Sequence, residues 1–143
     1  MPRVESQHFG VVDYDANAEI EFPQGLPGFD QEHHFVLIEP EALKPVIFLQ
    51  SLTTPGLCFT TLPVAALDPN YELQLSADDH GLLGGAGSLL ALTILCTGEN
   101  GSLTANLLAP VAIHLPNRMG VQAVRFDTKY SHAQPLGEAV SCS

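Results

Sequence analysis

The sequence predicts an all-β domain, built as a sandwich or a barrel of short strands. The apolar runs are short, and the 11 Pro and 12 Gly fall between them, as expected for strands joined by tight turns. The chain has 143 residues, of which 45% are hydrophobic and 15% are charged. This composition suits one domain with a buried core and argues against disorder.

Alternation of apolar and charged residues marks the first strand. Ile20 and Phe22 face one way and Glu19 and Glu21 the other, which is typical of a half-buried strand. Residues 89–96 are apolar on both faces and predict a central buried strand. Proline bounds most of the runs, because it lacks the amide that a central ladder needs. Strands are therefore expected at residues 18–22, 34–38, 46–52, 57–62, 71–75, 89–96, 103–108, 111–115 and 120–126.

Helix is expected in only two short segments. Residues 64–67 could form a single turn. Ser76 could cap a second turn that runs to Leu83, because its hydroxyl can accept a backbone amide hydrogen. The carboxylates of Asp78 and Asp79 would then lie near the positive end of the helix dipole and stabilise the helix.

A stiff loop is the first candidate surface for binding another protein. It consists of Pro23, Gln24, Gly25, Leu26, Pro27, Gly28 and Phe29. The pair Pro27-Gly28 is typical of a type II turn, and a loop that is ordered before binding loses little entropy on docking. The alternative is structural: Leu26 and Phe29 plug one end of a barrel.

A broken strand is the second candidate surface. Pro110 interrupts an otherwise long run, so a bulge or a register shift is expected there. It would redirect Asn106 and Leu108 toward a partner. The alternative is that Asn106 bonds the broken backbone and that the leucines belong to the core. A third candidate, Asn117-Arg118, lies on an expected turn, where Arg118 could pair with a carboxylate of a partner or of this chain.

A further set of matches extends these segments; together the matching residues are 22–29, 35–38, 49–52, 54–57, Asp68, Pro69, Tyr71, 106–110, Asn117, Arg118 and Gln122. In this order, and over about residues 9–136, they resemble the flagellar assembly factor FliW family. The resemblance implies one compact, partly open β-barrel over residues 1–136, followed by a tail at 137–143. It also implies a cytoplasmic protein that binds the RNA-binding translational regulator CsrA and flagellin.

Charge is distributed unevenly along the chain. The net charge is -11, and residues 1–43 hold nine acids against Arg3, which gives -8 for that segment. An acidic surface repels phosphate backbones and attracts basic proteins, which argues against direct binding of nucleic acid. The alternative is that the charge serves solubility. The acids expected to steer a basic partner are Glu19, Glu21, Asp30 and Glu32.

Three other clusters invite a chemical interpretation, and none supports one. His33 and His34 would point to opposite faces of a strand, so they would not share a metal ion. Residues 76–80 contain Ser, Asp and His, but a catalytic triad is assembled from separated segments. Residues 84–88 are Gly-rich, but a strand follows them where a phosphate loop needs a helix. We therefore expect no enzyme activity, no cofactor and no metal.

The three cysteines do not suggest a disulfide framework or a zinc knuckle. Cys58 and Cys96 lie in apolar runs and are expected to be buried, whereas Cys142 lies in the tail. The chain does not open with a basic stretch followed by an apolar one, and its most apolar run is too short to span a bilayer as a helix.

The residues and the resemblance together favour a regulator that works by protein contact and is monomeric when free. The resemblance implies a partner switch, in which release from flagellin allows binding to CsrA and relieves repression of the flagellin messenger. One alternative is a flagellin-specific chaperone that does not act on CsrA. An alternative of another class is a barrel that binds a small ligand such as a flavin.

Overall fold

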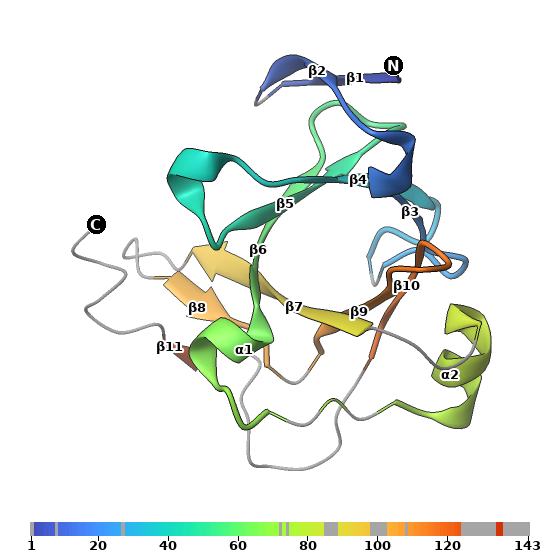
Figure 1. Cartoon of the computed structure of the whole chain (residues 1–143), viewed down its shortest axis with the longest axis vertical. Coiled ribbons are helices and arrows are strands. Elements are labelled where there is room, and N and C mark those ends of the chain that lie inside the picture. The colour runs from blue at the N-terminus through green and yellow to red at the C-terminus, as the bar shows by residue number, and fades with distance from the viewer. Residues whose placement is uncertain are drawn as a thin grey trace.

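Figure 1 shows the computed structural model of the chain. The structure describes residues 2–7, 9–26, 28–71, 73, 75–84, 89–97, 103–107, 109–123 and 134–135. Within them, seven strands form a closed ring, because β7 pairs with both β6 and β9 and because β10 pairs with β3. All the neighbouring pairs are antiparallel except β10 with β3. The ring consists of β3 (Glu19–Glu21), β4 (His34–Ile38), β5 (Ile47–Ser51), β6 (Cys58–Pro63), β7 (Leu89–Thr97), β9 (Val111–His114) and β10 (Met119–Gln122).

The predicted fold is confirmed as an all-β barrel of short, mostly antiparallel strands. The ring closes fully, and a short extension leaves it where the second half of β7 pairs with β8 (Leu103–Ala105). Strand β8 in turn pairs with β11 (Gln134–Pro135). The expected strand at residues 71–75 is wrong for the described positions Tyr71, Leu73 and Leu75, which are not in a strand. Leu73 and Leu75 pack instead in a small cluster beneath α2.

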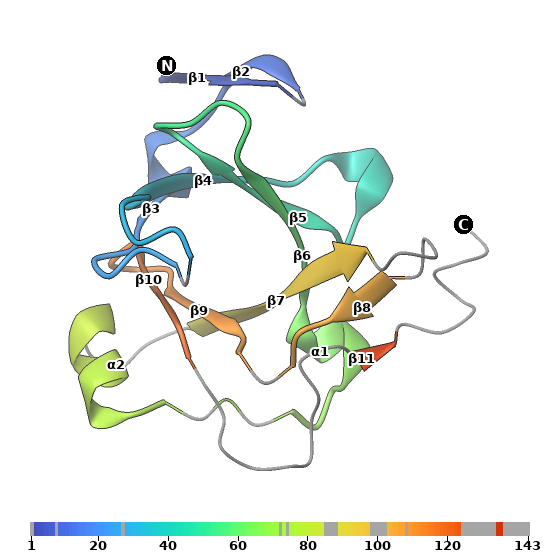
Figure 2. The same ribbon diagram turned by 180° about the vertical axis from the view of Figure 1, so that it is seen from behind.

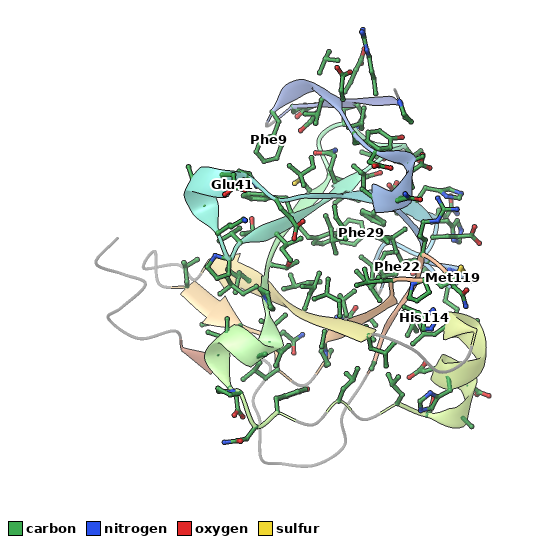
Figure 3. The ribbon with its side chains drawn as sticks, in the orientation of Figure 1. Phe9, Phe22, Phe29, Glu41, His114 and Met119 are labelled. Atoms are coloured by element: carbon green, nitrogen blue, oxygen red, sulfur yellow. The ribbon has the colours of Figure 1, made fainter. Side chains whose placement is uncertain are left out.

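An N-terminal hairpin, β1 (Arg3–Ser6) with β2 (Gly10–Asp13), was not expected from the sequence. It lies outside the barrel wall, at the top of Figures 1 and 2. The rings of Phe9 and Phe48 meet edge to face at 5.0 Å, and Figure 3 shows Phe9 pointing from the hairpin toward the barrel. The Ser6 hydroxyl donates to Gln50 Oε1 at 2.7 Å, so the hairpin is held by both apolar and polar contacts.

Both expected helical turns are confirmed. Helix α1 covers Val64–Leu67 and α2 covers Ala77–Leu83, and the Ser76 hydroxyl accepts from Asp79 N at 3.1 Å. Helix α2 ends at Gly84, whose φ of 91° is the left-handed conformation common at helix ends. Two 3₁₀ turns complete the described helical structure, η1 at Ala16–Ala18 and η2 at Glu41–Leu43.

The core fills the interior of the ring. The side chains that alternate inward are fully or almost fully buried, and Phe22 packs edge to face on Phe35 at 5.5 Å. Phe22 also lies directly against Gly120, where an added Cβ would come within 2.6 Å of the ring. The main cluster comprises Ile20, Phe22, Leu26, Phe35, Ile47, Leu49, Leu92, Val111 and Ile113.

The directions of the strands sort the connecting segments into two ends. Residues 22–33, residues 52–57 and the broken strand at residues 106–110 lie at one end, which we call the Phe29 end. Residues 39–46 and the turn at 115–118 lie at the opposite end, which we call the Arg118 end. Figure 2 looks at the Phe29 end and Figure 1 at the Arg118 end.

Candidate protein-binding site

The loop after β3 ends in a tight turn. Phe29 N donates to Leu26 O at 2.7 Å, and Leu26 N donates to Phe29 O at 3.3 Å. Gly28 has a φ of 84°, as the predicted type II turn requires at its second central position. Pro27 lies outside the described residues.

Gly25 allows the loop to fold back on itself. Its φ is 66°, and an added Cβ would lie 2.6 Å from the backbone oxygen of Asp30. Its amide donates to Phe22 O at 2.9 Å. These contacts restrict the backbone of the loop, and a loop that is ordered before binding loses little entropy on docking.

Leu26 and Phe29 have different surroundings, although they face each other across the turn. Leu26 is 2% exposed and belongs to the barrel core, so the plug interpretation holds for this residue. Phe29 is 40% exposed, and its ring packs edge to face on Phe59 at 5.4 Å. One turn therefore anchors itself with Leu26 and presents Phe29 to solvent.

Two hydrogen bonds tie this loop to the neighbouring turn. The hydroxyls of Ser51 and Thr54 donate to the two carboxylate oxygens of Glu32, the second at 2.8 Å. Glu32 was expected to steer a partner, but its carboxylate is already engaged in joining residues 28–32 to residues 51–54. Asp30 is exposed beside Phe29. A shallow hollow of about 390 Å³ here is lined by Gly28, Phe29, Asp30, Gln31 and Glu32.

The break at Pro110 is a register shift, as predicted. Leu95 pairs with Ala105 and Leu92 pairs with Val111, so a step of three residues along β7 matches a step of six residues along the opposite side. The extra residues form a bulge between β8 and β9. Leu108 lies outside the described residues, and Pro110 is buried.

Side chains satisfy the backbone groups that the bulge leaves without a ladder partner. Asn106 Oδ1 accepts from Ala109 N at 3.1 Å, and Gln122 Nε2 donates to Ala109 O at 2.9 Å. The Tyr71 hydroxyl donates to Leu107 O at 2.7 Å. The alternative in which Asn106 bonds the broken backbone therefore describes its geometry, and a role in binding stays a prediction for this residue.

Asn117 and Arg118 lie at the Arg118 end, away from the other candidates. Asn117 Nδ2 donates to Leu83 O at 3.2 Å and to Gly84 O at 3.3 Å, so it caps the end of α2. Arg118 adopts a φ of 55°, and its guanidinium donates to Ala16 O at 3.0 Å. The predicted hairpin turn is confirmed, and both side chains bond their own fold.

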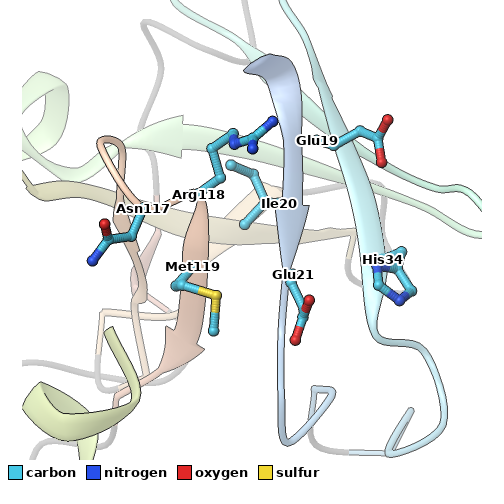
Figure 4. A pocket seen from close by; sticks show the side chains of 7 residues that line it. All are labelled: Glu19, Ile20, Glu21, His34, Asn117, Arg118 and Met119. Carbon is cyan, nitrogen blue, oxygen red and sulfur yellow. The ribbon is translucent and has the colours of Figure 1, made fainter. Parts of the chain in front are cut away.

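A hollow of about 220 Å³ lies over the seam between β3 and β10. Figure 4 shows Glu19, Glu21 and His34 on one side of it and Met119 and Asn117 on the other. The Tyr14 hydroxyl donates to Glu19 at 3.1 Å. Burial and this contact with Glu19 raise the pKa of Tyr14. Glu21 is exposed and makes no such contact within the described residues, so it is the freer of the two expected steering acids on this strand.

The described part of the chain contains no group of three or more His, Cys, Asp or Glu that could hold a metal ion. None of its helices has the length and hydrophobicity that a transmembrane helix requires. Burial raises the pKa of the half-buried Cys58 thiol to about 11. The expectation that Cys96 is buried is wrong, because it lies exposed near the end of β7, where the sheet leaves the barrel.

Comparison with known proteins agrees with this architecture. The family model described as FliW protein matches residues 3–136. The chain is 35% identical over 133 residues to the flagellar assembly factor FliW of Geobacillus sp. (strain WCH70), covering 90% of each chain. It is 36% identical over 131 residues to that of Azoarcus sp. (strain BH72), covering 85% of this chain and 90% of the relative. The chain belongs to the FliW family.

Membership of the FliW family also accounts for the fold. A crystal structure of the flagellar assembly factor FliW matches the chain with a TM-score of 0.85 at 30% identity, covering 96% of this chain and 99% of that one. The resemblance seen in the sequence is thus confirmed. Several of its matching residues, including Tyr71, Asn106, Asn117 and Gln122, hold the fold together.

Proposed function

We propose that this FliW family member is a cytoplasmic, non-enzymatic regulator that exchanges between flagellin and a CsrA-type RNA-binding protein. Binding to the CsrA-type protein would relieve repression of flagellin translation. The observation that best supports a contact surface is Phe29, which is 40% exposed on a turn already held by backbone hydrogen bonds. Aromatic side chains on rigid supports make efficient interface anchors.

The electrostatics of the chain support a basic partner. The net charge is -11, and exposed acids lie both beside Phe29 and on β3. A protein that holds RNA must be basic at its RNA site, so docking this chain nearby would lower the local positive potential and weaken phosphate binding. The effect does not require that the RNA site be covered.

A titration of the CsrA-type partner tests the switch. We expect added flagellin to weaken the binding of the CsrA-type protein to this chain. Added CsrA-type protein should weaken the binding of flagellin by the same factor, because linkage is reciprocal in binding free energy. Binding of both partners with no mutual effect would contradict a switch. Binding of flagellin alone would instead favour a flagellin-specific chaperone.

The barrel interior argues against the small-ligand alternative. Its core positions are filled by large apolar side chains such as Phe22, Phe35 and Leu92, each 0% exposed. A flavin-sized ligand would therefore have to bind outside the ring. We expect the purified protein to be colourless and free of bound nucleotide, which an absorption spectrum would check.

A further inference from the structure

The N-terminal hairpin has one face on the barrel and one face in solvent. Val4 and Ser6 are 5% and 7% exposed on the inner face. Val11, on the outer face, is 64% exposed, the largest value among the exposed large hydrophobic side chains of the described residues. Among the residues that the structure describes, the hairpin is a separate two-stranded sheet, and neither of its edges is paired with a strand of the barrel.

The phase of the hairpin ladder shows which backbone groups point outward. Tyr14 N donates to Pro2 O at 3.0 Å, so Pro2 and Tyr14 form a hydrogen-bonded pair. Val4 and Val12 are the pair two positions closer to the turn of the hairpin. Hydrogen-bonded pairs alternate with non-bonded pairs in an antiparallel ladder, so the pair of Val4 and Val12 exchanges its bonds within the hairpin. The N–H and C=O of Val11 therefore point away from β1, and those of Asp13 do the same.

The two edges of the hairpin differ in the side chains beside their outward-pointing backbone. Arg3 on the edge of β1 and Asp13 on the edge of β2 are paired with each other, with Arg3 Nε 2.9 Å from the Asp13 carboxylate. The remaining difference is Glu5 on β1, whose charge discourages pairing with another strand, against Val11 on β2. The edge of β2 thus presents backbone groups with no partner among the described residues, next to an exposed apolar side chain.

We propose that the edge of β2 binds an extended segment of a positively charged partner protein by strand addition. Backbone hydrogen bonds to Val11 and Asp13 would supply affinity, and an apolar residue of the segment would cover the Val11 side chain. Charge selects this occupant: residues 1–43 carry -8, so a basic segment is attracted and a second copy of this chain is repelled. The contact does not involve Phe29 and goes beyond the proposed partner switch.

A capped hexapeptide of alternating valine and lysine provides a direct probe. We expect it to slow hydrogen exchange at the amides of Val11 and Asp13 and to leave the amide of Glu5, on the opposite edge, unchanged. The matched variants are Val11→Pro and Glu5→Pro, because each removes one outward-pointing amide and neither removes a ladder bond. Val11→Pro should weaken peptide binding by about tenfold or more, and Glu5→Pro should leave it within about twofold.

Several results would overturn the proposal. The peptide could slow hydrogen exchange at the amide of Glu5, or at neither edge. Val11→Pro could bind the peptide with wild-type affinity. A peptide of the same charge, in which proline replaces the valines, could bind as tightly as the original peptide. A concentration-dependent dimer that Val11→Pro abolishes would assign the edge to a second copy. Val11→Lys keeps the amide and should also weaken the cationic peptide, so it serves as the test variant if Val11→Pro lowers the unfolding midpoint.

Discussion

Residues 22–33 and residues 106–110 lie at the same end of the barrel and both depart from regular strand structure, yet they use their side chains differently. The first segment closes a turn with backbone hydrogen bonds and leaves Phe29 exposed. In the second segment, the side chain of Asn106 bonds the backbone of the bulge, and Gln122 and Tyr71 from other segments bond it as well. A segment that matches a family can therefore owe its residues to folding as much as to binding.

The largest expected effect is on stability, and it distinguishes the buried Leu26 from the exposed Phe29 in the same turn. Leu26→Ala should lower the free energy of unfolding by about 2–5 kcal/mol, because Leu26 is 2% exposed and its loss leaves a cavity in the core. Urea denaturation measures this change. A decrease in the free energy of unfolding below about 1 kcal/mol would mean that the buried Leu26 side chain contributes little to stability.

The bulge provides the second prediction. Asn106→Ala should lower stability by about 1–3 kcal/mol, because it leaves Ala109 N without its acceptor. This follows the alternative left open by the sequence, in which Asn106 bonds the broken backbone. Asn106→Asp is the control, since it keeps an Oδ1 acceptor and should retain most of the stability. Equal unfolding midpoints for the alanine and aspartate variants would refute the structural role.

Charge-reversal variants compare how acids at the Phe29 end and on β3, and acids at the Arg118 end, affect the rate of association with a basic partner. Replacing the exposed Glu21 and Asp30 with Lys should slow association with a basic partner by about tenfold at low salt. Replacing Glu39 and Glu41 with Lys makes the same charge change at the Arg118 end and should have a smaller effect. Glu32 is left intact because its carboxylate holds the loop. Stopped-flow rates that are insensitive to salt in all variants would exclude steering.

The smallest expected effect is on cysteine reactivity. It compares Cys58 in the barrel strand β6 with Cys96 in the part of β7 that extends beyond the barrel. In a Cys142→Ser background, Cys58 should react with a thiol reagent at pH 8 at least about tenfold more slowly than Cys96. Its raised pKa of about 11 keeps it protonated until the pH approaches that value, and Cys96 is exposed. Peptide mapping after partial labelling distinguishes the two sites, and equal rates would show that Cys58 is accessible and ionised.

Local patterns predicted most of the fold. The alternation at residues 18–22 and the Ser76 cap each depend on near neighbours in sequence, and both match the structure. The N-terminal hairpin was missed because it is two four-residue strands held by distant contacts, such as Phe9 with Phe48.

The candidate site was harder to predict for the same physical reason. Asn117 bonds Leu83 O, 34 positions away, and no local pattern indicates that partner. Turn chemistry at Gly28 predicted the conformation of the stiff loop, but it could not tell which of Leu26 and Phe29 would be buried. That distinction depends on Phe59 and on the core beneath the turn.

The affinity of one matched pair of variants tests the central claim that the Phe29 end binds a protein partner. Phe29→Ala and Leu115→Ala remove side chains that are 40% and 44% exposed at opposite ends of the barrel. Calorimetric titration against the CsrA-type protein and against flagellin should show that Phe29→Ala loses about 1 kcal/mol or more with at least one of them, at nearly unchanged stability. Leu115→Ala should bind like the wild type. Wild-type affinity of Phe29→Ala for both partners, or an equal loss in Leu115→Ala, would contradict the account.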